Sequence, residues 1–365
     1  PDMKREEINI SSTKIIDSGL MYYSYLSKVA QPYFNKVVSI VGSSNLGKSE
    51  ISRKLSKKIK FYKTTAIAVA VCLFISLGLW LFIKSSNSNV SYGHFKLLDP
   101  ARAFLNPEDY LLNIQELRNY LFDLETQYPD SISIYYEQIN SGSNISVNKD
   151  LHLFPASLSK LAQAIIVAKK VEESVFSWDK KIKILSEDLA SESGTLYQRV
   201  GEGSEISVEE LLKELLVNSD NTAQNVFRRF LSVTDYLNFQ DLTGLQDLYN
   251  ENGFISAKEY TRLLRVLYTS SYLEPENSEK ILEYMAESSF GDYLSQGLPA
   301  EVKFAHKYGE NIQYNIFADS GIVYIPKRPY MLTVLIKGKD SSLETRAWAT
   351  KLMKEISEKA YEISK

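Results

Sequence analysis

The later part of the chain begins with the pattern of an amphipathic helix. Asn106 is a typical N-cap, and Pro107 suits the first helical position. Apolar residues then recur at helical spacing over 111–124. Two strand-like segments follow, at 131–139 and 144–148, and the Asn-Ser-Gly sequence between them is a turn signal. A helix and a β-hairpin are therefore expected at the start of this domain.

Helical periodicity predominates over residues 157–290. The segment 160–171 is apolar on nearly every side, which is typical of a helix in the middle of a domain. An amphipathic helix is expected over 343–363, and it is preceded by strand-like segments at 301–307, 314–319, 321–325 and 330–338. This order predicts an α+β fold, in which both ends of the domain meet on one antiparallel sheet beside an all-helical lobe.

Residues 64–83 form an uninterrupted apolar run, TTAIAVAVCLFISLGLWLFI. A helix of about 20 apolar residues crosses a hydrocarbon core of roughly 30 Å. Lysines crowd its N-terminal side, whereas Lys84 stands nearly alone beyond it, so the positive-inside rule places the N-terminus in the cytoplasm. We expect a cytoplasmic tail over 1–63, a retained transmembrane signal anchor, a polar linker over 84–106, and an outward-facing domain over 107–365.

Composition and charge agree with this division. The 42 basic and 45 acidic residues give a net charge of -3, but residues 1–63 carry 12 basic and 5 acidic side chains (+7), which leaves -10 beyond the anchor. The single cysteine, Cys72, excludes an intrachain disulfide, and three histidines make a multi-histidine metal site improbable. No metal, cofactor or nucleic acid is expected as a partner.

The tail contains one nucleotide-binding pattern. Residues 42–49 fit GxxxxGK[ST], with a strand-like segment before them and a helix-like segment after them. A nucleotide fold needs several βα units, however, and the apolar run begins 15 residues after Ser49. We therefore expect a basic tail near anionic lipid headgroups and no binding of ATP or GTP.

The first candidate chemistry is the pair Ser157 and Lys160 at the start of the apolar helix. Three residues of helix place the amine beside the hydroxyl. Serine needs a base to become a nucleophile, and a lysine can be that base if burial and a nearby cation lower its pKa. The helix N-terminus adds free N–H groups for a developing oxyanion.

Two further motifs follow in order. Ser219-Asp220-Asn221 begins 62 residues after Ser157, and Lys307-Tyr308-Gly309 begins 88 residues after Ser219. The succession SxxK, SDN, KxG is the signature of the penicillin-recognising serine acyltransferases. Over roughly residues 109–365 the sequence resembles the catalytic domain of the class A β-lactamases, and the fold that this resemblance implies agrees with the pattern above.

The resemblance implies a role for each serine and for the lysine of the first motif. Ser157 would be acylated, and Lys160 would take part in activating it. Ser219 would relay a proton to the leaving nitrogen, and Asn221 would hold the substrate amide and Lys160. Asp220 is expected to be structural.

The third motif would bind the substrate. Lys307 is similar to the cation that attracts the substrate carboxylate and that helps to keep Lys160 neutral. The backbone N–H groups of Ser157 and Glu310 would form the oxyanion hole, and Gly309 would permit close approach.

The sequence departs from the class A pattern at two places. The omega-loop element ExxLN, whose glutamate activates the deacylating water, is missing from residues 240–260. Glu251 is the nearby candidate for that base, and the alternative is a solvated loop residue. Tyr308 stands where the family usually has Ser or Thr, and His306 is taken as a neighbour of the motif.

These observations favour a membrane-anchored serine hydrolase of the β-lactamase or D-Ala-D-Ala carboxypeptidase type. It would act through an acyl-enzyme on β-lactams or on peptidoglycan stem peptides, and the missing omega-loop element would slow deacylation. The alternative is a module that binds cell-wall peptide or β-lactam as a sensor, with little turnover.

Overall fold

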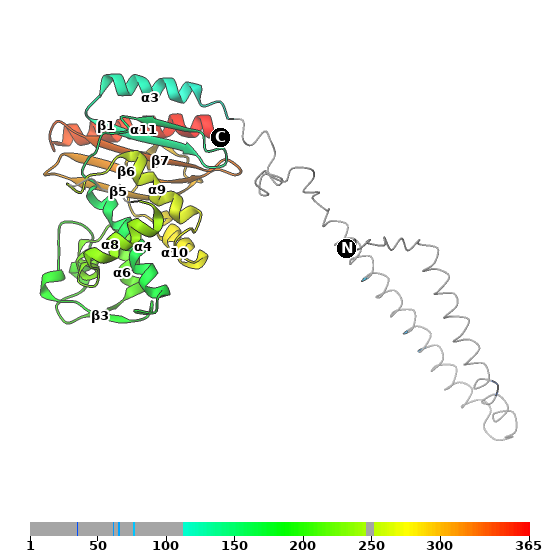
Figure 1. The fold of residues 1–365 in the computed structure, drawn as a ribbon, viewed down its shortest axis with the longest axis vertical. Coiled ribbons are helices and arrows are strands. Elements are labelled where there is room, and N and C mark those ends of the chain that lie inside the picture. The colour runs from blue at the N-terminus through cyan, green and yellow to red at the C-terminus, as the bar shows by residue number, and fades with distance from the viewer. Residues whose placement is uncertain (1–34, 36–60, 62–64, 66–75, 77–111, 246–251) are drawn as a thin grey trace, which may run out of the picture. The chain divides into compact units, whose positions relative to one another are not determined.

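A computed structural model describes residues 112–245 and 252–365, together with the single residues 35, 61, 65 and 76 (Figure 1). The chain divides into two units, Pro1–Leu98 and Asp99–Lys365, and every element below belongs to the second. Apart from those four single residues, the expected tail, anchor and linker lie outside the described residues, as do the P-loop-like match, Asn106 and Glu251. Among the residues that are described, the search for a helix long and apolar enough to cross a bilayer finds none.

A five-stranded antiparallel sheet forms the centre of the domain, with the strand order β2-β1-β7-β6-β5. The predicted hairpin is confirmed as β1 (Ile132–Gln138) and β2 (Asn144–Val147). Gly142 lies in its turn with a φ of +71°, a backbone conformation in which most other residues are strained. Every residue of β1 is buried, because β1 lies inside the sheet between β2 and β7.

The four later strand-like segments form three strands, within the three or four that the sequence predicts. The segments 314–319 and 321–325 form one strand, β6 (Ile316–Tyr324), between β5 (Lys303–Asn311) and β7 (Tyr330–Lys337). Gly321 lies within β6, where an added methyl group would sit 2.4 Å from the Ala305 oxygen. The glycine therefore permits close strand packing and does not turn the chain.

The terminal helices share one face of the sheet, as predicted. Helix α3 (Gln115–Gln127), α11 (Leu343–Ser364) and the 3₁₀ helix η5 (Tyr293–Gly297) contribute to one apolar cluster with that face (Figure 1). Helix α3 begins later than expected, because residues 112–114 are not helical. The Asn113 side chain accepts a hydrogen bond from the Gln115 N–H at 3.0 Å and so starts the helix there.

The helical lobe covers the opposite face and has its own apolar cluster. Helix α4 (Ser159–Glu172) is its central element, with residues 160–168 all buried, as its sequence predicts. A small two-stranded sheet, β3 (Lys181–Lys183) and β4 (Glu205–Ser207), was not predicted, because strands of three residues show too little alternation. The other elements of the lobe are η3 (Ala156–Leu158), η4 (Ser186–Asp188), α5 (Leu196–Arg199), α6 (Val208–Val217), α7 (Asn221–Arg228), α8 (Val233–Thr243), α9 (Ala257–Tyr268) and α10 (Pro275–Ala286).

Candidate active site

Ser157 lies at the junction between η3 and α4. It occupies the 3₁₀ turn, two residues before the α-helix begins at Ser159. Ala156 precedes it with a φ of +49°, a left-handed conformation that is uncommon for a residue with a side chain and that often accompanies functional sites. Ser157 is partly buried, and Lys160 follows in the next turn.

Lys160 joins the first two motifs. Its ammonium or amine nitrogen lies 2.7 Å from Asn221 Oδ1 and 3.3 Å from Ser219 Oγ, and it also donates to the Ser219 carbonyl oxygen. The side chain is fully buried. The structure thus brings together Lys160, Ser219 and Asn221, which are far apart in the sequence.

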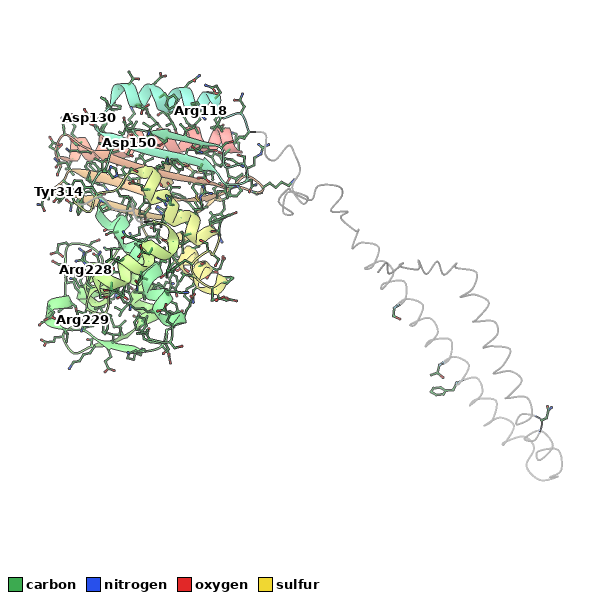
Figure 2. All side chains as sticks on the ribbon, viewed as in Figure 1. Arg118, Asp130, Asp150, Arg228, Arg229 and Tyr314 are labelled. Atoms are coloured by element: carbon green, nitrogen blue, oxygen red, sulfur yellow. The ribbon has the colours of Figure 1, made fainter. Side chains whose placement is uncertain are left out.

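The pKa of Lys160 is lowered to about 7. Burial is the largest cause, Asp220 opposes it, and Arg228, which lies in the helical lobe (Figure 2), adds to it. Near neutral pH the side chain is therefore divided between its ammonium and amine forms. A lysine in this state can accept a proton from a hydroxyl without a change of solution pH.

The hydrogen bonds of Lys160 direct its lone pair. The Ser219 carbonyl oxygen can only accept a hydrogen bond. The same holds for Asn221 Oδ1, the amide atom that is directed at Lys160. A neutral amine has two N–H groups, and these two acceptors use both. The remaining lone pair can accept from a hydroxyl, and the hydroxyl that lies within reach of the nitrogen is that of Ser219, at 3.3 Å.

The SDN motif is held in place by its own buried contacts. Ser219 is fully buried with a φ of +53°, and its carbonyl also accepts from Ser193 Oγ at 2.9 Å. Asp220 caps α7 by accepting from the Ala223 N–H at 2.9 Å and also accepts from the Leu196 N–H at 2.8 Å. No pattern in the sequence predicted the hydrogen bond from Ser193 to the Ser219 carbonyl.

The third motif lies on β5, which is an edge strand of the sheet. Side chains alternate along a strand, so Lys307 and Gly309 share one face while Tyr308 and Glu310 share the other. A methyl group at position 309 would lie 2.7 Å from the Ser157 nitrogen. Gly309 is therefore required for the close approach of β5 to the Ser157 N–H, as the sequence predicted.

Lys307 is a second buried cation in this region. Burial holds the pKa of Lys307 well below its usual value, repulsion from Lys160 lowers it further, and Asp319 opposes both. Its nitrogen donates to the Tyr308 carbonyl at 3.2 Å. The sequence suggested that Lys307 helps to keep Lys160 neutral, whereas the cation that lowers the pKa of Lys160 in the structure is Arg228. Repulsion between two ammonium groups is mutual, so burial and repulsion both favour the loss of a proton from the pair Lys160 and Lys307.

Tyr308 and His306 belong to the face of β5 that points away from Ser157. The Tyr308 ring stacks on Phe290 with centroids 3.6 Å apart. His306 Nδ1 lies 2.8 Å from Asp319, and both side chains are buried. His306 is thus a neighbour of the motif, as expected.

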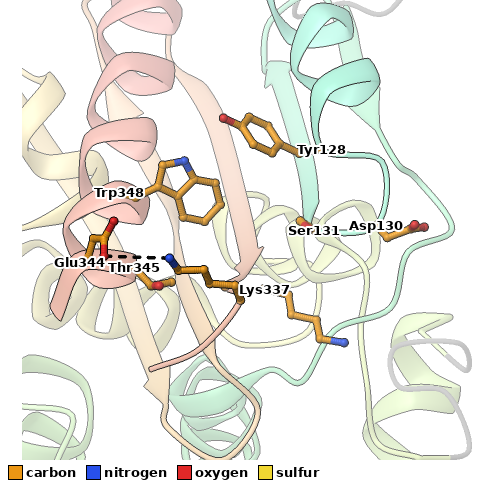
Figure 3. Close-up of a pocket in the computed structure, with 9 residues that line it drawn as sticks. Tyr128, Asp130, Ser131, Lys337, Glu344, Thr345 and Trp348 are labelled. Carbon is orange, nitrogen blue, oxygen red and sulfur yellow. Dashed lines mark ion pairs between the residues drawn. The ribbon is translucent and has the colours of Figure 1, made fainter. Parts of the chain in front are cut away.

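A pocket of about 590 Å³ lies elsewhere in the domain (Figure 3). Trp348 and Tyr128 form an aromatic wall with centroids 5.4 Å apart, and Lys339 pairs with Glu344 at 4.0 Å. None of the predicted site residues lines this pocket. Among the residues that the structure describes, no group of three or more acidic, histidine or cysteine side chains is placed to hold a metal ion.

Comparison with known proteins identifies the family. Residues 115–363, more than half of the chain, match the family model described as the Beta-lactamase enzyme family. The chain belongs to this family. A relative, β-lactamase VEB-1 of Pseudomonas aeruginosa, is 23% identical over 210 residues, which cover 51% of this chain and 70% of VEB-1.

Solved structures confirm the β-lactamase-like fold. PBP-A matches with a TM-score of 0.60 and 20% identity, over 68% of this chain and 96% of PBP-A. The extended-spectrum β-lactamase TLA-3 matches with a TM-score of 0.61 and 20% identity, over 68% and 98% of the two chains. A β-lactamase from Sphaerobacter thermophilus has a TM-score of 0.61 and 16% identity, over 69% and 97%.

Proposed function

We propose that this protein is a serine hydrolase that forms an acyl-enzyme with β-lactams or with D-Ala-D-Ala-like peptides. The observation that supports the proposal is the set of contacts at Lys160, a buried lysine with a pKa of about 7 whose nitrogen contacts the side chains of Ser219 and Asn221. The family supports the substrate class, since one similar structure is an acyl-enzyme complex of a PBP-A mutant with penicillin G.

In the acylation step, neutral Lys160 accepts the proton of the Ser157 hydroxyl, and Ser157 Oγ attacks the amide carbonyl carbon. The backbone N–H groups of Ser157 and Glu310 stabilise the oxyanion. The carbon–nitrogen bond then breaks, and Ser219 passes a proton from Lys160 to the leaving nitrogen. The 3.3 Å contact between Lys160 Nζ and Ser219 Oγ provides the path for that proton.

The substrate is held by the two remaining polar groups. The Asn221 amide binds the side-chain amide of the acyl part, and Lys307 binds the carboxylate. A carboxylate beside Lys307 favours its ammonium form and raises its pKa, so binding of an anionic ligand is accompanied by proton uptake.

Deacylation distinguishes the two functions that the sequence left open. A hydrolase releases the acyl group, whereas a sensor keeps it. Because the ExxLN element is missing from the sequence, we expect an adduct with a fluorescent penicillin to form and to persist far longer than that of an efficient class A enzyme. A time course by gel fluorescence and intact mass measures this directly. Rapid release of hydrolysed penicillin would contradict slow deacylation, and complete failure to form an adduct would contradict the proposed function.

The rate of acylation is expected to depend on pH through Lys160. Its amine form is the base, so the limiting acylation rate at saturating penicillin should rise with pH, by about tenfold per unit well below 7, and level off above it. The measurement is labelling by a fluorescent penicillin between pH 5 and 9, with circular dichroism as a check on folding. A rate constant that is independent of pH over this range would exclude Lys160 as the base.

A further inference from the structure

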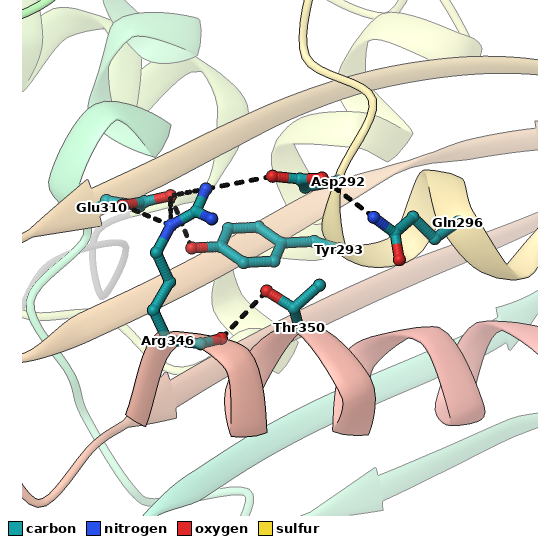
Figure 4. Close-up of polar contacts among 6 residues, drawn as sticks. All are labelled: Asp292, Tyr293, Gln296, Glu310, Arg346 and Thr350. Carbon is teal, nitrogen blue, oxygen red and sulfur yellow. Dashed lines mark hydrogen bonds and ion pairs between the residues drawn. The ribbon is translucent and has the colours of Figure 1, made fainter. Parts of the chain in front are cut away.

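We infer that Arg346 and Tyr293 are positioning residues, which hold the Glu310 side chain and thereby fix the edge of β5 where its backbone faces Ser157. The inference rests on the proposed function, because the position of β5 affects a reaction rate only if acyl transfer takes place at Ser157. Figure 4 shows the cluster, in which η5, β5 and α11 each contribute a side chain.

Glu310 is held by two different donors. Its Oε1 accepts from the Tyr293 hydroxyl at 2.6 Å and from Arg346 Nη2 at 2.9 Å and Nε at 3.1 Å. Arg346 Nη2 also lies 3.1 Å from Asp292, so the guanidinium is fixed between two carboxylates. Three hydrogen bonds to one oxygen, two of them from a planar guanidinium, leave the Glu310 side chain little freedom.

The two donors are themselves rigid and keep their protons. Tyr293 is fully buried with a φ of +58°, and its ring contacts Phe290 at 5.0 Å between centroids. Burial and the bond to Glu310 raise the pKa of Tyr293, and the bond to Glu310 raises that of Arg346. Both side chains therefore remain donors over the whole pH range in which the enzyme would work.

The position of β5 needs this support. Among the described residues, β5 is paired only with β6, so no second strand of this part of the chain fixes its outer side. The face of β5 that includes Gly309 approaches η3 and leaves no room even for a methyl group beside the Ser157 nitrogen. Glu310 is the next residue, and its N–H is the second donor of the proposed oxyanion hole. Its side chain points to the opposite face, so the cluster acts from behind the strand without touching the substrate.

The cluster is partly exposed, which allows a clean test. The side chains of Arg346 and Glu310 are 36% and 33% exposed, and ion pairs of this kind contribute little to stability. Substitutions are therefore expected to leave the fold intact and to change the reaction. A residue with only a structural role would instead change the melting temperature.

The test measures penicillin acylation of Arg346→Gln and Tyr293→Phe over a range of ligand concentrations. The titration gives two separate quantities, the limiting acylation rate and the ligand concentration at which the rate is half of that limit. Since loss of a whole oxyanion donor lowers rates by about 10²- to 10³-fold, misplacement of one should lower the limiting rate by about tenfold and leave the half-saturating concentration within about twofold. Lys351→Gln, on the same helix but paired only with Glu355 at 3.8 Å, is the matched control and should react like the wild type.

The variants Arg346→Gln and Glu310→Gln are also combined. Because both act through the same contact, the double variant should be no slower than the slower single variant. Additive losses would contradict the inference, as would an unchanged limiting rate in both Arg346→Gln and Tyr293→Phe.

Amide hydrogen exchange of the segment 303–311 tests the same cluster without a substrate. Exchange should be faster in Arg346→Gln than in the wild type, and unchanged in Lys351→Gln. If the wild type forms no adduct, the proposed function fails, and exchange alone decides whether the cluster holds β5. Exchange that is unchanged in Arg346→Gln overturns the inference in either case.

Discussion

Ser157→Ala is expected to abolish covalent labelling by a fluorescent penicillin. Ser157 lies at the start of α4, one turn from Lys160, and its N–H faces the glycine of β5. An alanine leaves this backbone in place but removes the oxygen that forms the ester. Gel fluorescence should therefore fall to background, and peptide mass mapping of the wild type should find the adduct on Ser157.

The matched control for this variant is Ser159→Ala. Ser159 lies in the same turn, but its hydroxyl donates to the Ala156 carbonyl at 2.9 Å and belongs to the local backbone structure. Labelling of Ser159→Ala should stay within severalfold of the wild type. Labelling of Ser157→Ala at the wild-type rate, or an adduct mapped to another residue, would remove Ser157 from the role of nucleophile.

The sequence predicted the parts of the fold that depend on local pattern. Strand alternation gave β1 and β7, and helical periodicity gave the buried α4, because both patterns repeat over many residues. The segments 314–319 and 321–325 look separate in the sequence but form the single strand β6. A glycine such as Gly321 is compatible with a turn or with a close approach of two strands, and only the neighbouring strand decides between these two.

The candidate site divides in the same way. The three motifs were visible because each is short and contiguous, and their order predicted that they would meet. The cluster of Tyr293, Glu310 and Arg346 was not visible, because these residues belong to three elements and have ordinary surface character in the sequence. The lowered pKa of Lys160 was expected, but Arg228 as the contributing cation follows only from tertiary packing.

Lys160→Met is expected to slow acylation by about 10²- to 10⁴-fold, the usual contribution of a general base. Methionine keeps an unbranched side chain of similar length but cannot accept a proton. Lys169→Met is the matched control: it removes a lysine from the same helix, where the side chain pairs with Glu172 at 3.0 Å. The rate should be measured at pH 8, where the wild-type amine is mostly neutral. A loss of less than fivefold would show that another group is the base.

The same variant tests the pKa through stability. Lys160 has a pKa of about 7 in the folded protein and an ordinary value of 10.5 in the unfolded chain, so between these values the unfolded chain binds more protons. The free energy of unfolding of the wild type should therefore rise relative to that of Lys160→Met as the pH increases from 7 to 10. The slope should approach about 1.4 kcal/mol per pH unit midway between the two values, where the unfolded chain binds nearly one proton more. Urea unfolding of both proteins at several pH values measures this difference. If the two curves run parallel, the pKa of Lys160 is not lowered in the folded protein, and the lysine is protonated at neutral pH and cannot start the reaction as a base.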